Sequence, residues 1–525
     1  MIVDLRRSHE STELETDLCV IGGGAAGIAI ALEFLDAGAE VIVLESGGLR
    51  FGRQAERFND GDTVGIDRRS LTSGRARGLG GATSLWAGQC LPADPEALSE
   101  RPWVPHSGWP FPLAELEPFY RRAEKVLQIQ GCHYDETVWD EFGVERPCFD
   151  TSRLAHRFSV WCPRPHLGRL YRRALSDSPN VRVLLDATVT ELVTTPGGQR
   201  FDSVLAAAPG ASSVRVRARA CVICTGAIEN ARLLLASTGA NRDGIGNRHG
   251  LVGRFFSDHP NGHSAAILGG DVARLQELYG LFYRERVRYL PRLVLSAQAQ
   301  RAERVLSCAA HPVFHFGEDS GVEAARRVYR SARSGRRPET WPQDLRLIAR
   351  DLPRVAAIAR RRFTAGRSAG LRPIAVTLQT HAEQAPNPDS RVTLGRRRDA
   401  LGVPVPAVSW RLTELDRRTA SAMVATVADE FRRRGLGEVR PAPWLTESNW
   451  REHLHDSIHQ MGTTRLGEAP EASVVSPDCE IHDVSGLFVA GASVFPAAGY
   501  VNPTLTIMAL AIRLADHLKR VLGSP

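Results

Sequence analysis

The feature that most constrains this chain is a glycine turn between an apolar strand and a helix near the N-terminus. Residues 18–21 are apolar and run directly into Gly22-Gly23-Gly24-Ala25-Ala26-Gly27, after which a helical pattern begins. In such a turn the first glycine allows a tight bend, the second lets a pyrophosphate approach the backbone, and the third lets the helix pack closely on the strand. The amide groups at the helix start then face the phosphates. The pattern predicts a Rossmann-like α/β domain that binds a dinucleotide.

A carboxylate supports the same prediction. A second apolar strand at 40–44 ends in Glu45, eighteen residues past Gly27. A carboxylate there can accept hydrogen bonds from ribose hydroxyls and would repel a 2′-phosphate. A glycine-rich turn without a ligand would have to produce this placement by coincidence. The turn and the acid together do not separate FAD from NAD.

Composition bounds the class of protein. The chain has 525 residues, 43 % of them hydrophobic and 24 % charged, which is the length of two globular domains rather than one. Its longest apolar stretches, such as 18–30 and 507–515, are short or interrupted, so we expect no transmembrane segment. The N-terminal residues carry charge throughout and lack the apolar core of a secretory signal, so we expect a cytoplasmic protein.

Charge and cysteines exclude two further classes. The net charge is +7, but the chain has only two lysines and no recognised nucleic-acid-binding signature, so we expect no nucleic-acid partner. Nine cysteines without regular close spacing do not describe a disulfide framework. Cys221 and Cys224 lie three residues apart in a predicted strand, which points them to opposite faces. We therefore expect neither a redox pair nor a metal site there.

Two dense clusters lie outside the first turn. Residues 75–86 read RARGLGGATSLW, in which glycines and small hydroxyl residues allow the backbone to run against something flat or anionic. Near the other end the chain reads HQMGTTRLG from His459 and LFVAGASVFPAAGYVNPTLTIMALAIRLADHL from Leu487. These segments resemble the glucose-methanol-choline (GMC) oxidoreductase family. Further matching segments are TGAIENARLLL from Thr225, LVGRFFSDHP from Leu251 and EQAPNPDSRVTL from Glu383.

The resemblance implies a fold and an activity. The fold would be a FAD-binding Rossmann-like domain joined to a substrate-binding domain built on an antiparallel sheet. Residues 12–95, 180–265 and 450–525 would form the FAD domain, and 96–179 and 266–449 the substrate domain. The closing pattern pairs histidine with asparagine, as in pyranose oxidases, sugar 3-oxidases and related carbohydrate dehydrogenases. It implies a catalytic pair of His459 and Asn502 in an enzyme that oxidises a hydroxyl of a sugar, glycoside or sugar-containing natural product.

The expected cofactor is FAD, bound without a covalent link. In pyranose oxidases a histidine before the tryptophan of the glycine loop carries the covalent link, whereas Leu85 stands at that position here. Gly491 replaces an acid of the family pattern, which changes one contact on the phosphate side. The residues expected to contact FAD are Gly22, Gly24, Ala25, Ala26, Gly27, Glu45, Ser46, Arg77, Gly80, Gly81, Thr83, Ser84, Trp86, Val189, Thr225, Gly226, Gly491, Ala492, Asn502, Pro503 and Thr504.

The two proposed catalytic side chains suit alcohol oxidation. A proton must leave the hydroxyl oxygen while a hydride leaves carbon, and histidine is a suitable base at neutral pH. The Asn502 amide can orient the alcohol oxygen without titrating. Pro503 then starts the last helix, whose amides can face the pyrimidine edge of the flavin. His259, His453, His455 and His482 have no comparable claim from the sequence.

Some alternatives remain open. A flavin-containing lyase or decarboxylase on the same fold, or oxidation of a non-sugar alcohol, would use the same cofactor site. The sequence does not distinguish oxygen from another electron acceptor. For the substrate domain, strand patterns at 372–382, 390–395 and 406–411 suggest the antiparallel sheet, with a helix from Asp416 covering it.

A basic segment at 326–372 has no place in the FAD chemistry. Apolar residues recur there at helical spacing, arginines lie largely on other faces, and Pro353 interrupts the pattern. It predicts a surface helix over the substrate domain. The sharper hypothesis is a docking surface for an anionic membrane, a phosphate-bearing glycan or an acidic electron-transfer partner.

Overall fold

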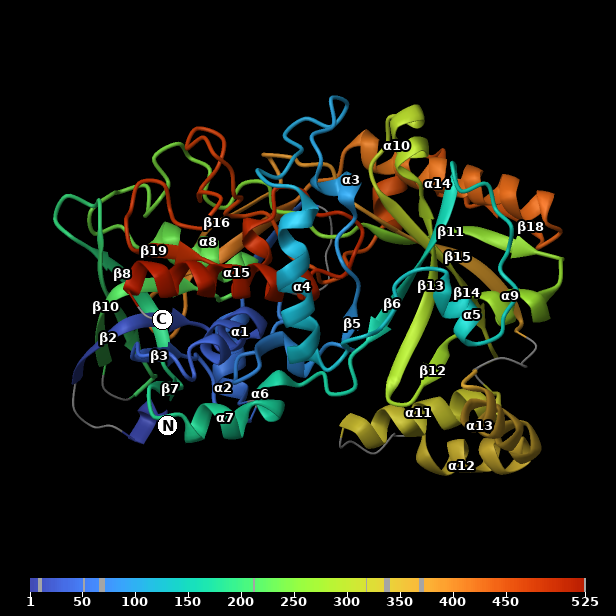
Figure 1. Cartoon of the computed structure of the whole chain (residues 1–525), viewed down its shortest axis with the longest axis horizontal. Helices are drawn as coiled ribbons and strands as arrows, with labels where there is room; N and C mark the ends of the chain where they lie inside the picture. Colours follow the sequence, from blue (N-terminus) through green and yellow to red (C-terminus); the bar gives the residue numbers. More distant parts are fainter. Residues whose placement is uncertain are drawn as a thin grey trace.

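The protein is described by a computed structural model covering residues 1–7, 12–50, 52–65, 71–210, 213–317, 319–334, 340–367 and 373–523. Two large sheets lie side by side along the long axis of the molecule (Figure 1). The first sheet carries the nucleotide turn and the second carries the predicted substrate surface. No helix among the described residues is long and apolar enough to cross a membrane.

The first sheet has the order β1-β7-β3-β2-β10-β9-β8, with β19 beside β10. Neighbours from β1 to β10 pair parallel, whereas β10, β9 and β8 form an antiparallel extension. The predicted first strand, at 18–21, is only the buried end of a longer β2, and a short β1 precedes it. The strands are β1 (Ile2–Asp4), β2 (Thr12–Ile21), β3 (Val41–Leu44), β7 (Val181–Leu185), β8 (Thr188–Thr194), β9 (Phe201–Ala207), β10 (Ser213–Ile223) and β19 (Leu487–Val489).

The glycine turn packs as the spacing predicts. Gly22 has a φ of +104°, and a Cβ there would lie 2.7 Å from the carbonyl oxygen of Cys224. A Cβ on Gly27, in α1 (Ala25–Glu33), would lie 1.9 Å from the carbonyl oxygen of Gly22. Any side chain at either position would therefore force the helix away from the sheet.

The second sheet has the order β18-β11-β15-β14-β13-β6-β5, with β12 beside β13, and its pairs are antiparallel. Helix α14 (Glu414–Arg433) covers one face, as predicted, and begins with a capping box between Thr413 and Asp416. The strands are β5 (Gln89–Cys90), β6 (Leu154–Trp161), β11 (Asn261–Leu268), β12 (Phe282–Arg284), β13 (Val287–Leu295), β14 (Cys308–His315), β15 (Ala375–Ala382) and β18 (Glu438–Pro441).

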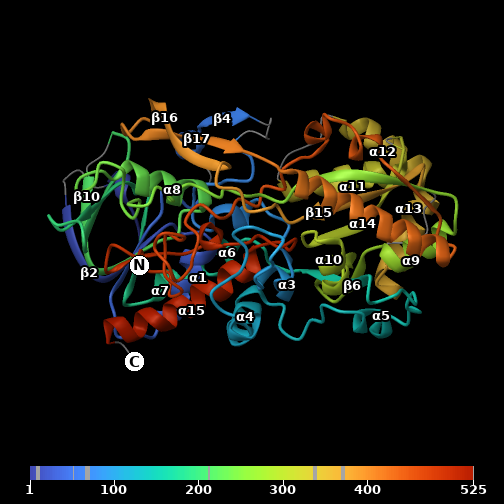
Figure 2. The same cartoon turned by 90° about the horizontal axis from the view of Figure 1, so that it is seen from above.

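One prediction about this sheet is wrong. Of the three segments expected in it, only 372–382 contributes a strand, β15. The other two form the hairpin β16 (Arg391–Arg398) and β17 (Pro404–Trp410), which pairs with β4 (Asp62–Gly65) in a separate three-stranded sheet. This sheet lies beside α8 (Ala227–Ala236) in the view from above (Figure 2). Strand patterning identified the strands but carried no information on their partners.

The basic segment forms three surface helices rather than one. They are α11 (Gly321–Ser334), α12 (Trp341–Arg350) and α13 (Leu352–Ala365), which project below β12 in Figure 1. Pro353 stands in the first turn of α13, directly after the break at Asp351, as its lack of an amide hydrogen predicts.

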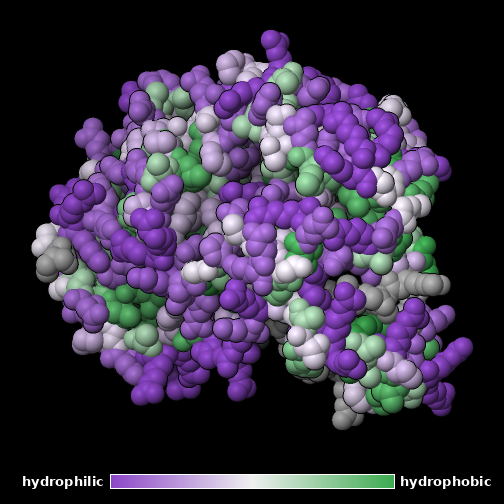
Figure 3. Space-filling view, turned by 45° about the vertical axis from the view of Figure 1, so that its right-hand side comes forward, coloured by the Kyte–Doolittle hydropathy of each residue, from purple (hydrophilic) through white to green (hydrophobic). Residues whose placement is uncertain are grey.

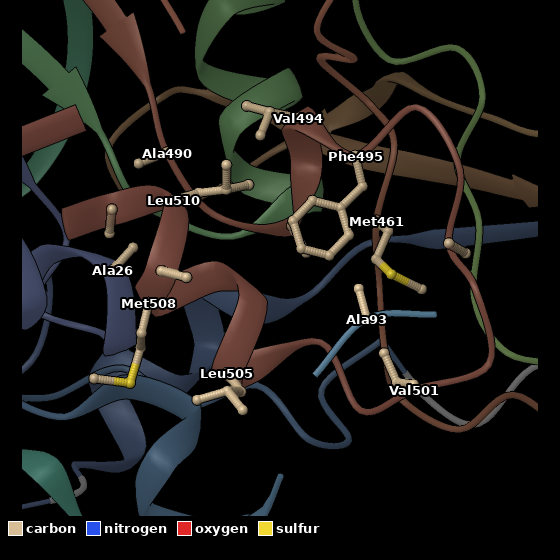
Figure 4. Close-up of a cluster of buried hydrophobic side chains, with 14 of the residues drawn as sticks. Ala26, Ala93, Met461, Ala490, Val494, Phe495, Val501, Leu505, Met508 and Leu510 are labelled. Carbon is tan, nitrogen blue, oxygen red and sulfur yellow. The ribbon is translucent and has the colours of Figure 1, made fainter. Parts of the chain in front are cut away.

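The C-terminal helix α15 (Thr504–Leu522) packs on α1 and on α4 (Leu113–Leu127). Figure 4 shows the buried cluster around its first turns, where Leu505 and Met508 point into the core and Met461 and Val501 lie on the adjoining segments. Met461 follows His459 by two residues and Val501 directly precedes Asn502. Burial of these two apolar side chains therefore fixes both segments of the predicted catalytic pair.

Shorter elements complete the described chain. The helices are α2 (Arg53–Glu56), α3 (Pro95–Leu98), α5 (Thr137–Glu141), α6 (Leu167–Leu170), α7 (Arg172–Asp177), α9 (Val272–Tyr279) and α10 (Ala297–Glu303). The 3-10 turns are Leu5–Arg7, Arg57–Asn59, Gly81–Ser84, Pro443–Leu445, Trp450–His453 and Ala492–Val494.

Candidate active site

A cavity of about 520 Å³ brings the separated motifs together. Its wall contains the predicted catalytic pair, His459 and Asn502. It also contains most of the residues predicted to contact FAD: Gly22, Gly24, Ala25, Ala26, Glu45, Ser46, Arg77, Gly81, Thr83, Trp86, Val189, Thr225, Gly226, Gly491, Ala492, Pro503 and Thr504. Gly27, Gly80 and Ser84 lie behind this wall. Gly27 packs α1 on the sheet, and the Ser84 hydroxyl donates to the carbonyl of Gly81 at 2.6 Å.

One end of the cavity exposes backbone to a ligand. A Cβ built on Gly24, Gly226 or Gly491 would meet no atom within 4 Å, so each of these glycines faces open space. Gly24 caps the N-terminus of α1, whose first amides lack partners within the helix. A pyrophosphate fits such an opening, because helix-terminal amides and a close backbone approach both favour it.

Glu45 occupies the predicted position at the end of β3 but has additional partners. Its carboxylate accepts the amides of Gly23 at 2.8 Å and Gly47 at 2.9 Å. Burial raises the pKa of Glu45, and these amides oppose that shift by stabilising the charged form. Each carboxylate oxygen has a second lone pair, so Glu45 can hold the turn and still accept a ribose hydroxyl.

An arginine cluster lies on the same side and was not fully predicted. Glu229, in α8, contacts Arg75 at 2.5 Å, Arg77 at 2.9 Å and Arg232 at 3.1 Å. Burial alone would raise the pKa of Glu229, but the three cations lower it to about 2. Arg232 in turn pairs with Asp399 at 2.6 Å, which ties the hairpin β16–β17 to this wall. Only Arg77 carried a sequence prediction, because nothing local marks the other members.

Another part of the cavity wall is apolar. Leu85 lines it with 53 % of its surface exposed, which is unusual for a leucine inside a protein fold. Trp86 beside it donates its indole N–H to the carbonyl of Pro165 at 2.8 Å. Opposite them, Pro503 and Thr504 begin α15 on the cavity wall. An aromatic ring system fits between an apolar side chain and a helix N-terminus of this kind.

His459 and Asn502 lie in direct contact in the same wall. Asn502 Nδ2 is 3.2 Å from His459 Nε2. The His459 segment is held by Asp258, whose Oδ1 accepts the amides of His259 at 2.8 Å and of Ser457 and His459 at 3.0 Å each. A single buried carboxylate therefore holds the 457–459 segment against the segment of His259.

Arg292 determines how the Asn502 amide is oriented. Its guanidinium Nη2 donates to Asn502 Oδ1 at 3.4 Å. A guanidinium is only a donor, so the amide oxygen faces Arg292 and the NH₂ group faces His459. Nε2 of His459 therefore accepts, and the proton of the neutral ring resides on Nδ1. The pattern fixes the tautomer in which Nε2 has a free electron pair.

His259 continues this arrangement, although no motif predicted a role for it. Its Nδ1 lies 2.9 Å from His459 Nδ1. Because His459 Nδ1 carries the proton, His259 Nδ1 accepts it, and the proton of the neutral His259 ring lies on Nε2. The Asp-His-Pro sequence at 258–260 was a signal for this residue, but only the fold brings it to His459.

Burial and charge keep these rings neutral. Burial first and the Arg292 cation second lower the pKa of His459 to about 4. Burial also lowers the pKa of His259 well below its usual range, with a contribution from His459. The pKa of Arg292 is lowered by burial to about 10, so it remains a cation at neutral pH. His459 is thus an unprotonated base beside a fixed positive charge.

A row of polar side chains crosses the second sheet on the same face as Arg292. In register, Arg292 on β13 lies opposite Arg157 on β6. The β13–β14 register continues to His311, and His311 lies opposite Gln379 on β15. The rings of His311 and His381 stack with centroids 5.4 Å apart. Opposed residues of an antiparallel pair share a face, so these donors and acceptors form one polar surface beside the catalytic pair.

The residues present fit FAD. The open glycines at the start of α1 suit a pyrophosphate, and Glu45 retains acceptor capacity for a ribose. The exposed Leu85 and the N-terminus of α15 suit an isoalloxazine ring at the opposite end. His459 Nε2 and Asn502 then lie where a substrate would meet that ring.

Comparisons with known proteins show which family this chain is similar to. Residues 169–261 and 386–511 match the two models described as GMC oxidoreductase. The fructose dehydrogenase large subunit of Gluconobacter japonicus is 24 % identical over 583 aligned residues, covering 96 % of this chain and 98 % of that protein. The C-glycoside 3-oxidase of Arthrobacter globiformis is 38 % identical over 129 residues, covering 24 % of this chain and 23 % of that protein.

The fold is shared with solved structures. A formate oxidase structure superposes with a TM-score of 0.58 at 16 % identity, covering 98 % of this chain and 99 % of that chain. At this identity the likeness concerns the fold alone.

Proposed function

We propose that this chain, which matches both GMC oxidoreductase models, is an FAD-dependent oxidoreductase of that family acting on CH–OH groups, and that it oxidises a hydroxyl of a sugar, glycoside or sugar-containing natural product. The observation that carries this proposal is the contact of Asn502 Nδ2 with His459 Nε2, 3.2 Å apart in the wall of the cofactor cavity. It presents one base and one hydrogen-bonding amide to the same substrate atom.

The base is His459. FAD, when bound in this cavity, supplies the two-electron acceptor that takes the hydride from the substrate carbon. His459 Nε2 accepts the hydroxyl proton, and the resulting imidazolium keeps its Nδ1 proton in the hydrogen bond to His259 Nδ1. The alcohol therefore loses one proton and one hydride and becomes a carbonyl compound.

Asn502 and Arg292 prepare that base. Before substrate binds, the Asn502 NH₂ group donates a hydrogen bond to His459 Nε2 at 3.2 Å. A substrate hydroxyl can replace it as donor to Nε2 while its oxygen accepts from the same NH₂ group. Arg292 keeps the amide turned this way, and its positive charge favours the alkoxide character that develops on oxygen.

The polar row on the second sheet supports a sugar-like substrate. Arg157, His311 and Gln379 offer donors and acceptors on the face that carries Arg292, whereas a small apolar alcohol would need none of them. The names of the relatives fit this class, since one is a fructose dehydrogenase subunit and another a C-glycoside 3-oxidase.

We also propose that FAD is bound without a covalent link. Leu85, which lines the flavin end of the cavity, has no nucleophile to offer. The electron acceptor that reoxidises the flavin is either oxygen or another acceptor.

Anaerobic titration of the purified holoenzyme with a panel of sugars, glycosides and simple alcohols tests the proposal. Oxidised flavin absorbs at about 450 nm and reduced flavin does not, so reduction is followed as the loss of this absorbance. Sugars or glycosides should bleach the flavin in preference to simple alcohols. Turnover of a substrate without flavin bleaching would favour a lyase or decarboxylase, and bleaching by simple alcohols alone would refute the sugar assignment.

A further inference from the structure

The three helices α11, α12 and α13 form a lobe that the oxidation chemistry does not use. The lobe is fixed to the substrate half rather than loosely attached. Within the lobe, Arg327 in α11 pairs with the buried Asp344 in α12 at 2.5 Å, which joins these two helices to each other. Arg367, directly after α13, donates to the carbonyl of Glu277 and stacks its guanidinium over the Phe282 ring at 3.9 Å. A firmly held lobe can present a defined surface to a partner.

The outer surface of the lobe carries large apolar side chains. Phe363 is 86 % exposed and Leu352 is 56 % exposed, and α13 buries none of its residues. Trp341 and Leu345, one turn apart on α12, are also exposed. Single exposed apolar residues are ordinary, but four on two adjacent short helices form a group that indicates an interaction surface. Figure 3 shows apolar surface among hydrophilic surface on the lobe at its lower right.

The same two helices carry an excess of positive charge. Arg346, Arg350, Arg354, Arg360, Arg361 and Arg362 lie on α12 and α13. Among the described residues none of these six forms an ion pair with a carboxylate within 4 Å. The acids on these helices are Asp344, which is buried against Arg327, and Asp351. The lobe therefore combines exposed apolar groups with uncompensated cations.

We propose that α12 and α13 dock the enzyme on an anionic membrane surface. Amphipathic helices with arginines and exposed Leu, Phe and Trp side chains lie in the membrane interface, where the apolar groups enter the acyl boundary and the cations meet lipid phosphates. A convex lobe suits a flat membrane. A nucleic acid would use the arginines without the apolar group, and an acidic protein partner would leave Phe363 in water unless it supplied a matching pocket.

Co-sedimentation of the flavin-loaded full-length protein with vesicles tests this surface. Vesicles of phosphatidylcholine mixed with phosphatidylglycerol should bind the protein, vesicles of phosphatidylcholine alone should not, and added salt should weaken the binding. Phe363→Ser and the double variant Arg354→Gln/Arg361→Gln should each lower the bound fraction. The expected loss is roughly fivefold in partition coefficient for each arginine removed.

Matched controls separate the lobe from net charge and general stickiness. Leu268→Ser removes an exposed apolar residue elsewhere on the substrate half, and Arg173→Gln/Arg432→Gln removes two exposed arginines outside the lobe. Both should bind vesicles like the parent, and all variants should keep their flavin content and melting temperature. If the protein does not sediment with anionic vesicles, the proposal is wrong. It is equally wrong if the lobe binds an acidic protein but not these vesicles. Equal losses in lobe and control variants would overturn it as well.

Discussion

Arg292→Met is the substitution that best tests the arrangement of the active site. Arg292 is only 3 % exposed, and no carboxylate among the described residues pairs with it. Its hydrogen bond holds the Asn502 oxygen away from His459. Without that bond the Asn502 amide can rotate and present its oxygen to His459 Nε2. An oxygen there favours the His459 tautomer that is protonated on Nε2, and that tautomer cannot accept the substrate proton. Methionine has a similar length and no hydrogen-bonding group, so it removes this constraint without leaving a large hole.

The expected loss of rate follows from the geometry. A hydrogen bond to a charged group contributes about 1.5–3 kcal/mol. The Arg292–Asn502 contact is long at 3.4 Å, so we take the lower end, about 1.5 kcal/mol. Because about 1.4 kcal/mol corresponds to about tenfold in rate, flavin reduction at saturating substrate should slow about tenfold.

The pH profile supplies a second, independent readout. His459 works as the neutral ring, so activity falls as the pH drops through its pKa, which is about 4. Four titratable or charged groups surround the His459 ring. Arg292 on β13 is a cation, His259 and His381 are neutral, and Asp258 accepts the backbone amide of His459. Removing the Arg292 cation raises the pKa of His459, so the acid limb should move to higher pH. Burial, the larger cause of the lowered pKa, persists, so the limb should stay below pH 6.5.

Anaerobic stopped-flow reduction by a confirmed substrate, measured across pH, provides both readouts. Arg292→Lys is the matched control, because it retains the cation and should leave the acid limb near its original position. The melting temperature of Arg292→Met should stay equal or rise, since an unpaired buried cation is replaced by an apolar side chain. If Arg292→Met reduced its flavin at the parent rate with an unchanged acid limb, the assigned tautomer and the positioning role of Arg292 would both be wrong.

Three further predictions address the cofactor and the base. His459→Ala should retain FAD but slow flavin reduction roughly a hundredfold or more, the scale for losing a positioned base; a parent-like rate with full flavin loading would transfer that role to another residue. Glu45→Gln should lower the flavin-to-protein absorbance ratio, because one remaining carbonyl oxygen cannot serve Gly23, Gly47 and a ribose together; an unchanged ratio would remove Glu45 from the ribose site. Acid or heat should release FAD into the supernatant, and flavin that stays with the precipitated protein would contradict the non-covalent assignment at Leu85.

Most of the residues that the motifs predicted lie in the cavity wall, because the motifs are local. A tight bend or a close backbone approach requires glycine at a given position, so Gly22, Gly24 and Gly27 are visible in the sequence and pack as their spacing requires. Asn502 and Pro503 likewise precede an apolar helix that must be buried. At such positions the local backbone geometry requires a particular residue type, so the residue in the sequence reveals the geometry.

The pairing of strands was not accessible in the same way. Segments 390–395 and 406–411 alternate as strands should, but alternation is satisfied by any partner that buries one face. In the structure the two strands pair with each other, and β17 also pairs with β4, more than three hundred residues earlier in the chain. The contact of Arg232 with Asp399 at 2.6 Å helps hold that sheet against α8, and it joins residues that no local pattern connects.

Arg292, which contacts the predicted catalytic pair, was not predicted from the sequence although a signal was present. In a chain with 66 basic residues an arginine attracts no notice. The informative fact is its neighbourhood: Arg292 interrupts the apolar run of β13, Leu290 to Leu295, where a charge is buried once the sheet forms. A buried cation without an acid partner lowers stability, so its presence beside Asn502 is best explained by what it does there. It orients the amide, and through the amide it selects the tautomer of His459.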